Sequence, residues 1–229
     1  MERIEKKKWL ALVATAAKGD AEAQWTMGYY HEYGVMTLSR KVLVFPNKSE
    51  AMHWYMLAAE QDYYPAQGSL SNILSEGDQP DYPAAIRWAK AAIKLGDASS
   101  AYNLGIIYRD MGKPKAAFRY YQLAATMGHF DAHLQIGLCY LLGHGVATDH
   151  AAAQACFRKI LQADANQSRQ RSREDAQYWL ALLNLMGLGQ RRNLGQAREM
   201  LELANADDDH EMANDLLNVI GRSVRSGLR

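Results

Sequence analysis

The chain has little of several features that would place it in a large class of proteins. Only two of its 229 residues are cysteine, Cys139 and Cys156, too few for a disulfide-stabilised secreted scaffold and in keeping with a reducing compartment. No run of apolar residues approaches the length of about 18 that a membrane-spanning helix needs. The formal net charge is +1, so no overall electrostatic attraction draws the chain to nucleic acid or to an anionic membrane.

Catalytic and metal-binding motifs are also scarce. Gly143 and Gly145 are not followed by the Gly-Lys-Ser/Thr of a phosphate-binding loop, and no Gly-x-Ser-x-Gly nucleophile turn occurs. His129 and His133 are four residues apart, so on a helix they would share a face and could hold a metal ion. No third ligand accompanies them. We therefore expect no catalytic residue, no metal and no cofactor, with this histidine pair as the alternative.

What the chain does have is a repeated helix–turn–helix pattern. An apolar helical run over 134–142 ends at Gly143, where a left-handed glycine would close a helix. Val146 follows, and Asp149 stands in the N-cap position before an alanine-rich run. The same spacing returns at 187–193, with Asn193 in the capping position.

The helices on either side of the turn recur as well. A first pattern of small and apolar residues starts at Ala23, Ala66, Ser100, Ala132 and Ala176. A second, in which alanines flank a bulky residue, spans 51–59, 85–93, 117–125, 153–161 and 197–205. Repeats with a period of about 30 to 45 residues are typical of helical solenoids, in which stacked helix pairs build one continuous core.

The combination resembles Sel-1-like repeat proteins of the tetratricopeptide-like superfamily. Three elements carry the resemblance: the Ala-x-x-x-x-Gly helices, the Gly-x-Gly-Val-x-x-Asp turn at 143–149 and the Ala-x-x-Trp-Tyr-x-x-Ala-Ala helix at 51–59. The chain departs from the turn at 77–81 and 111–115. The resemblance implies an all-α fold, a right-handed α-α superhelix (solenoid) of about five helical hairpins with half-repeat caps.

We expect a single solenoid over residues 1–221, with a frayed tail at 222–229. The expected units lie near 20–62, 63–96, 97–128, 129–165 and 172–208, and the caps at 2–18 and 210–220. A basic start and an apolar segment would also suit a secretory signal peptide, but Glu2 and Glu5 interrupt the basic part, and 16–23 matches the later helix end at 125–132. We therefore interpret 2–18 as a helical cap and expect a cytoplasmic protein.

Most aromatic residues look structural, but one row on the first helices has a different character. Trp54, Trp88 and Tyr120 occupy a position that holds Cys156 and Met200 in other units, which is typical of packing. In such solenoids the first helices line a concave groove that binds a protein or peptide. The position three residues after each start would face it, and two tyrosines would extend the same face. The expected partner-binding residues are Thr26, Tyr29, Tyr33, Ser69, Asn103, Gln135 and Trp179.

The resemblance implies a non-enzymatic protein–protein interaction module, a bacterial adaptor or scaffold that binds a partner protein. The alternative is an immunity protein that binds and neutralises a cognate toxic effector. Two further segments are candidate contacts. The long loop 34–48 contains a β-prone run at 42–45, which either tucks against the helices or binds a partner. The segment 169–173 carries three arginines.

Overall fold

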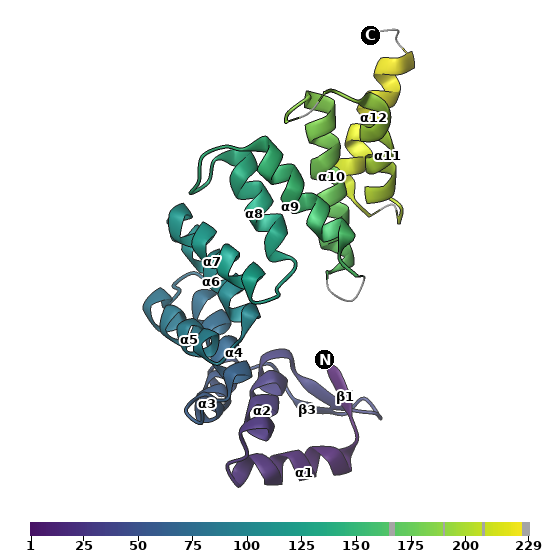
Figure 1. Cartoon of the computed structure of the whole chain (residues 1–229). Coiled ribbons are helices and arrows are strands. Elements are labelled where there is room, and N and C mark those ends of the chain that lie inside the picture. The colour runs from purple at the N-terminus through teal and green to yellow at the C-terminus, as the bar shows by residue number, and fades with distance from the viewer. Residues whose placement is uncertain (165–167, 190, 208, 226–229) are drawn as a thin grey trace. The chain divides into compact units, whose positions relative to one another are not determined.

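The computed structural model describes residues 1–164, 168–189, 191–207 and 209–225, with side chains up to residue 220. These ranges contain twelve α-helices and three short β-strands (Figure 1). The chain divides into two compact units, residues 1–107 and 108–229. The division falls inside helix α6 (Ala98–Asp110).

Unit 1 (residues 1–107) stacks its helices in sequence order. Its helices are α1 (Lys6–Ala17), α2 (Ala21–Tyr33), α3 (Lys48–Ala59), α4 (Tyr64–Ser75), α5 (Tyr82–Lys94) and most of α6. Each of α1 to α4 packs on the helix that follows it. The side chains of Asp20, Asn47 and Asp81 accept backbone N–H groups at the starts of α2, α3 and α5, which satisfies donors that have no partner within the helix.

A small sheet stands beside these helices and corrects one expectation. Strand β1 (Glu2–Ile4) pairs in parallel with β2 (Val35–Thr37), which pairs antiparallel with β3 (Val42–Val44). The helix predicted over 2–18 therefore begins only at Lys6, because the residues before it use their backbone groups in the sheet. The β-prone run in the 34–48 loop is confirmed as β3.

Unit 2 (residues 108–229) continues the repeat. Its helices are α7 (Pro114–Thr126), α8 (Ala132–Leu142), α9 (His150–Gln162), α10 (Gln170–Met186), α11 (Leu194–Ala204) and α12 (Glu211–Arg225). As predicted, Gly143 and Gly187 end α8 and α10 in the left-handed conformation, with φ of 73° and 68°. Asp149 and Asn193 cap α9 and α11, also as predicted. Helix α12 runs past its predicted end at residue 220, and residues 226–229 of the expected tail lie outside the described part.

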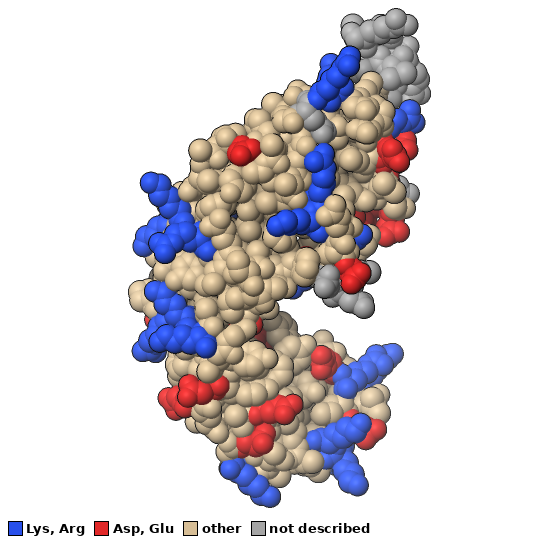
Figure 2. Space-filling model, in the orientation of Figure 1, with Lys and Arg blue, Asp and Glu red and all other residues tan. Residues whose placement is uncertain are grey.

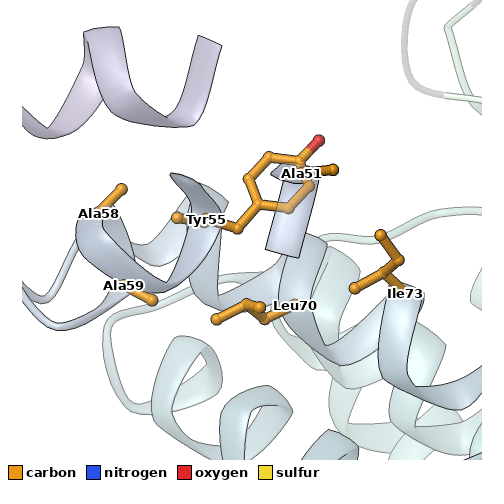
Figure 3. Packing of buried hydrophobic residues seen from close by; sticks show 7 residues of the cluster. Ala51, Tyr55, Ala58, Ala59, Leu70 and Ile73 are labelled. Atoms are coloured by element: carbon orange, nitrogen blue, oxygen red, sulfur yellow. The ribbon is translucent and has the colours of Figure 1, made fainter. Parts of the chain in front are cut away.

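The core of each hairpin is formed by alanines that let the helices approach and by a few large side chains. In unit 1, Tyr55 and Leu70 are 1% and 0% exposed among the buried alanines of α3 (Figure 3). In unit 2, Phe157 and Leu180 fill the corresponding space. The helical hairpins of each unit therefore bury apolar clusters between them, and the predicted all-α repeat fold is confirmed.

Candidate functional site

A row of aromatic side chains runs along one face of α2. Trp25, Tyr29 and Tyr33 are spaced four residues apart, so they lie one above another on the helix. Their ring centroids are 6.3 Å apart for Trp25 and Tyr29 and 4.8 Å apart for Tyr29 and Tyr33. Tyr63, just before α4, lies 6.3 Å from Trp25. We call these four residues the aromatic ladder, and its outermost member, Tyr33, is 52% exposed.

Hydrogen bonds beneath the ladder connect it to the hairpin core. The indole Nε1 of Trp25 donates to Ser69 Oγ at 3.0 Å, which joins α2 to α4. The hydroxyl of Tyr55, on α3, donates to Glu32 Oε2 at 2.7 Å. Burial first, and then this hydrogen bond, raises the pKa of Tyr55 well above its ordinary value, while a hydrogen bond from Ser69 acts the other way. Tyr55 therefore stays a neutral donor and holds Glu32 in place.

Glutamates surround the ladder. Tyr29 donates its hydroxyl to Glu2 Oε1 at 2.9 Å, and this hydrogen bond is the first cause that raises the pKa of Tyr29. A hydrogen bond to Glu32, then burial, and then the charges of Glu32 and Glu76 raise the pKa of Tyr33 to about 12. Among the described residues, neither Glu2 nor Glu32 nor Glu76 forms an ion pair with a lysine or arginine.

A hollow opens at the Tyr33 end of the ladder. It has a volume of about 230 Å³, and its wall includes Glu32 from α2 and Glu76 from the end of α4. Lys48 also lines it, and its Nζ donates to the backbone carbonyl of Glu76 at 3.2 Å. The ladder therefore ends at a space with two carboxylates on its wall, which suits a cationic or hydrogen-bond-donating side chain.

Besides the two tyrosines, three of the predicted partner-binding residues in unit 1 make bonds within the protein. Thr26 donates to the carbonyl of Glu22 at 2.8 Å, one turn earlier in α2. Ser69 accepts from Trp25, as described above. Asn103 donates to Asn72 Oδ1 at 2.9 Å, which joins α6 to α4. Ser69 and Asn103 thus take part in bonds between successive first helices, while Tyr29 is partly buried and Tyr33 is exposed.

The two predicted residues in unit 2 lie in different surroundings. Gln135 lines a cavity of about 210 Å³ together with Tyr121 and Cys139. Trp179 is partly buried, packs against the apolar cluster around Phe157, and its ring centroid is 5.3 Å from that of Tyr178. The structure therefore brings Thr26, Tyr29, Tyr33 and Ser69 together on α2 and α4 in unit 1 and gives Trp179 a packing contact.

The histidine pair does not share a helical face. Helix α8 begins at Ala132, so His129 lies in the preceding turn and only His133 is on the helix. The metal hypothesis built on that spacing is wrong. Burial first, and then the charge of Lys159, lowers the pKa of His133. No group of three His, Cys, Asp or Glu within the described ranges is arranged to hold a metal ion.

The arginine-rich segment is engaged in contacts within unit 2. Arg169 Nε lies 3.5 Å from Asp131 Oδ2, and its backbone N–H donates to Asp131 Oδ1. Arg173 donates to three carbonyl oxygens, those of Ile160, Leu161 and Ala163. These carbonyls lie in the last turn of α9 and at its C-cap, so a positive charge there satisfies acceptors and complements the helix dipole.

The ladder includes two residues that sequence reasoning assigned to no site, Trp25 and Tyr63. The four-residue spacing of Trp25, Tyr29 and Tyr33 was the available signal, because it predicts one helical face. The contribution of Tyr63 had no local signal, since it depends on how α4 packs against α2.

Within the described ranges, no helix combines the length and the hydrophobicity that a membrane span requires.

A family model described as Sel1 repeat matches residues 21–63, 65–97, 98–129, 130–163 and 174–209. A curated protein, chitin synthase regulatory factor 3 of Schizosaccharomyces pombe, is 34% identical over 116 residues, which are 50% of this chain and 11% of that protein. The chain therefore spans only a small part of this relative.

Three solved structures have a similar fold. A protective antigen of uropathogenic Escherichia coli with an SLR fold gives a TM-score of 0.76 at 25% identity, over 93% of this chain and 44% of that one. A Sel1 repeat protein from Oxalobacter formigenes gives 0.66 at 27% identity, over 84% and 74%. A further one from Klebsiella pneumoniae subsp. pneumoniae gives 0.53 at 22% identity, over 90% and 96%, and shares the fold.

Proposed function

Since the chain belongs to the Sel1 repeat family, we propose that it is a non-enzymatic adaptor. It binds a partner protein on the face of unit 1 that carries the aromatic ladder. One observation carries the proposal. The aromatic ladder places tyrosine and tryptophan rings, the residue types that dominate interface hot spots, in a row on a rigid helix face. The polar contacts beneath it fix that row before any partner arrives.

Preorganisation supports a binding role because ordering surface side chains on association costs free energy. Tyr29 is already held by Glu2, and Trp25 by Ser69. The relative from S. pombe is named a regulatory factor, which favours an adaptor that brings a partner into a complex. We place the protein in the cytoplasm, supported by its two free thiols, Cys139 and Cys156.

Affinity capture from the source cells, followed by mass spectrometry, tests the proposal. Three baits are compared: the wild-type chain, Tyr29→Ala/Tyr33→Ala, and Leu95→Ala, a control at an exposed apolar residue that follows α5. We expect a stoichiometric partner that the ladder variant loses and the control keeps. Retention of every partner by the ladder variant would contradict the proposal. A single captured partner that is toxic when expressed alone would replace the adaptor role with that of an immunity protein.

A further inference from the structure

Charge differs sharply between two faces of unit 1. Glu2, Glu22, Glu32 and Glu76 surround the aromatic ladder, and among the described residues none of them has a lysine or arginine within ion-pairing distance. In the view of Figure 2, acidic side chains lie where α2 is seen in Figure 1, and basic side chains gather where α5 is seen.

The basic face belongs to the second helix of a hairpin. Arg87, Lys90 and Lys94 of α5 are all exposed and spaced so that they share one side of the helix. They line a shallow hollow with Asp62 and Leu95. A positively charged partner is therefore repelled at α5 and attracted at α2, which gives one face of the unit a preference for cations.

From this arrangement we infer that the ladder binds a basic peptide segment of the partner protein, with an arginine side chain over the tyrosine rings and toward the Glu32 and Glu76 carboxylates. The inference rests on the proposed function and adds the chemistry of the partner. Charge complementarity is its basis, since the carboxylates around the ladder lack cationic partners within the described part of the chain.

The geometry favours arginine over other donors. The exposed face of Tyr33 offers a ring for cation–π stacking. The hollow beyond it has two carboxylates on its wall, and a planar guanidinium donates to carboxylates through several N–H groups at once. Lys48 lies in the same hollow, but its Nζ is bonded to a backbone carbonyl and pairs with neither carboxylate. Glu32 already accepts the hydroxyls of Tyr55 and Tyr33, so an incoming arginine would use the lone pairs of Glu32 that remain and the carboxylate of Glu76.

Selection from a random peptide display library on the full chain tests the inference. We expect the enriched peptides to be rich in arginine and to be lost when the selection uses Tyr29→Ala/Tyr33→Ala. Enriched peptides that depend on the ladder but are neutral or acidic would overturn the basic-segment inference and leave the proposed function standing. A selection with no ladder-dependent peptide would overturn the inference, and the capture experiment above would then decide the function separately.

Affinity measurements on one selected peptide separate charge from shape. Replacing its arginines by citrulline, a neutral isostere, is expected to weaken binding to the wild-type chain. Glu32→Gln/Glu76→Gln is expected to weaken the arginine peptide about tenfold, the effect of two partly exposed charge pairs, and to leave the citrulline peptide unchanged. The matched control is Asp62→Asn, which removes one carboxylate on the α5 side.

The glutamine substitutions keep an acceptor for the Tyr55 hydroxyl, and the circular dichroism melt of each variant checks its fold. Glu22→Gln/Glu76→Gln serves as the second variant if Glu32→Gln unfolds the hairpin, because it leaves Glu32 intact. Equal weakening by Asp62→Asn, or equal affinity for the arginine and citrulline peptides, would overturn the inference.

Discussion

Two hairpins, one in each unit, solve the same packing problem with different residues. In α2–α3, a methyl group added to Gly28 would lie 2.4 Å from Tyr55 Cδ1, and in α8–α9 one added to Gly137 would lie 2.5 Å from Phe157 Cε1. Both rings are buried. In both hairpins the absence of a side chain on the first helix therefore makes room for an aromatic ring on the second.

The aromatic side chains of Tyr55 and Phe157 differ by one oxygen atom. The Tyr55 hydroxyl reaches Glu32 at the base of the ladder, whereas Phe157 packs in an apolar cluster with Leu180 and Leu183. At this core position Phe157 serves packing alone, whereas Tyr55 serves both packing and the arrangement of the ladder. One hydroxyl beneath the surface therefore connects the core of α2–α3 to the aromatic ladder.

Removing either ring should have the largest effect. Tyr55→Ala and Phe157→Ala each leave a cavity, and we expect each to lower the free energy of unfolding by about 3–5 kcal/mol. Urea denaturation followed by circular dichroism measures this. Leu203→Ala is the control, since Leu203 is 52% exposed. Losses of similar size for the control and for the two ring variants would contradict the packing account.

The next largest effect on stability is expected from adding a methyl group at the glycine that faces each ring. We expect Gly28→Ala and Gly137→Ala to cost about 1–3 kcal/mol of unfolding free energy because the ring must move. Gly195→Ala in α11 is a control of opposite sign: its nearest contact would be 3.6 Å, an ordinary separation, so this change should stabilise the chain by about 0.5–1 kcal/mol. The same denaturation measurement applies, and stabilisation by all three variants would refute the close contact.

Exchanging the two aromatic residues tests the role of the hydroxyl. Phe157→Tyr buries a hydroxyl in an apolar cluster, which we expect to cost about 1–3 kcal/mol of unfolding free energy. Tyr55→Phe removes the bond to Glu32 and should cost about 1 kcal/mol, with a measurable loss of partner affinity. A Tyr55→Phe variant that loses stability but no affinity would separate the core from the surface site.

The smallest effect concerns pH. The folded pKa of Tyr33 is raised to about 12, first by its hydrogen bond to Glu32, above the ordinary value of about 10. Its contribution to stability is therefore complete below the ordinary pKa and disappears as the pH rises through about 12. Ultraviolet titration of tyrosinate should show a late-titrating residue, and Glu32→Gln should shift it to lower pH. An unshifted titration in that variant would rule out Glu32 as the cause.

The fold was predictable because its signals are local. Gly143 and Asp149 mark a helix end and a helix start within a few residues, and both act as predicted. The sheet was only half predictable: the composition of 42–45 indicates a strand, but the pairing of Glu2–Ile4 with Val35–Thr37 depends on a contact between distant segments. Tyr29 and Tyr33 could be predicted from helical spacing. The contacts of Glu32, Ser69 and Trp179 could not, because they depend on how neighbouring helices pack.

The small sheet has a consequence for how such a chain can lengthen. The glycine–aromatic contact lies within one helical hairpin, so a tandem duplication of that hairpin copies both partners together. The parallel pairing of β1 with β2 joins a segment that precedes α1 in the sequence to one that follows α2. Duplication of a single hairpin therefore does not reproduce it. Duplication of a later hairpin such as α8–α9 therefore keeps its glycine–aromatic contact intact, whereas β1, α1, α2 and β2 form one interdependent block.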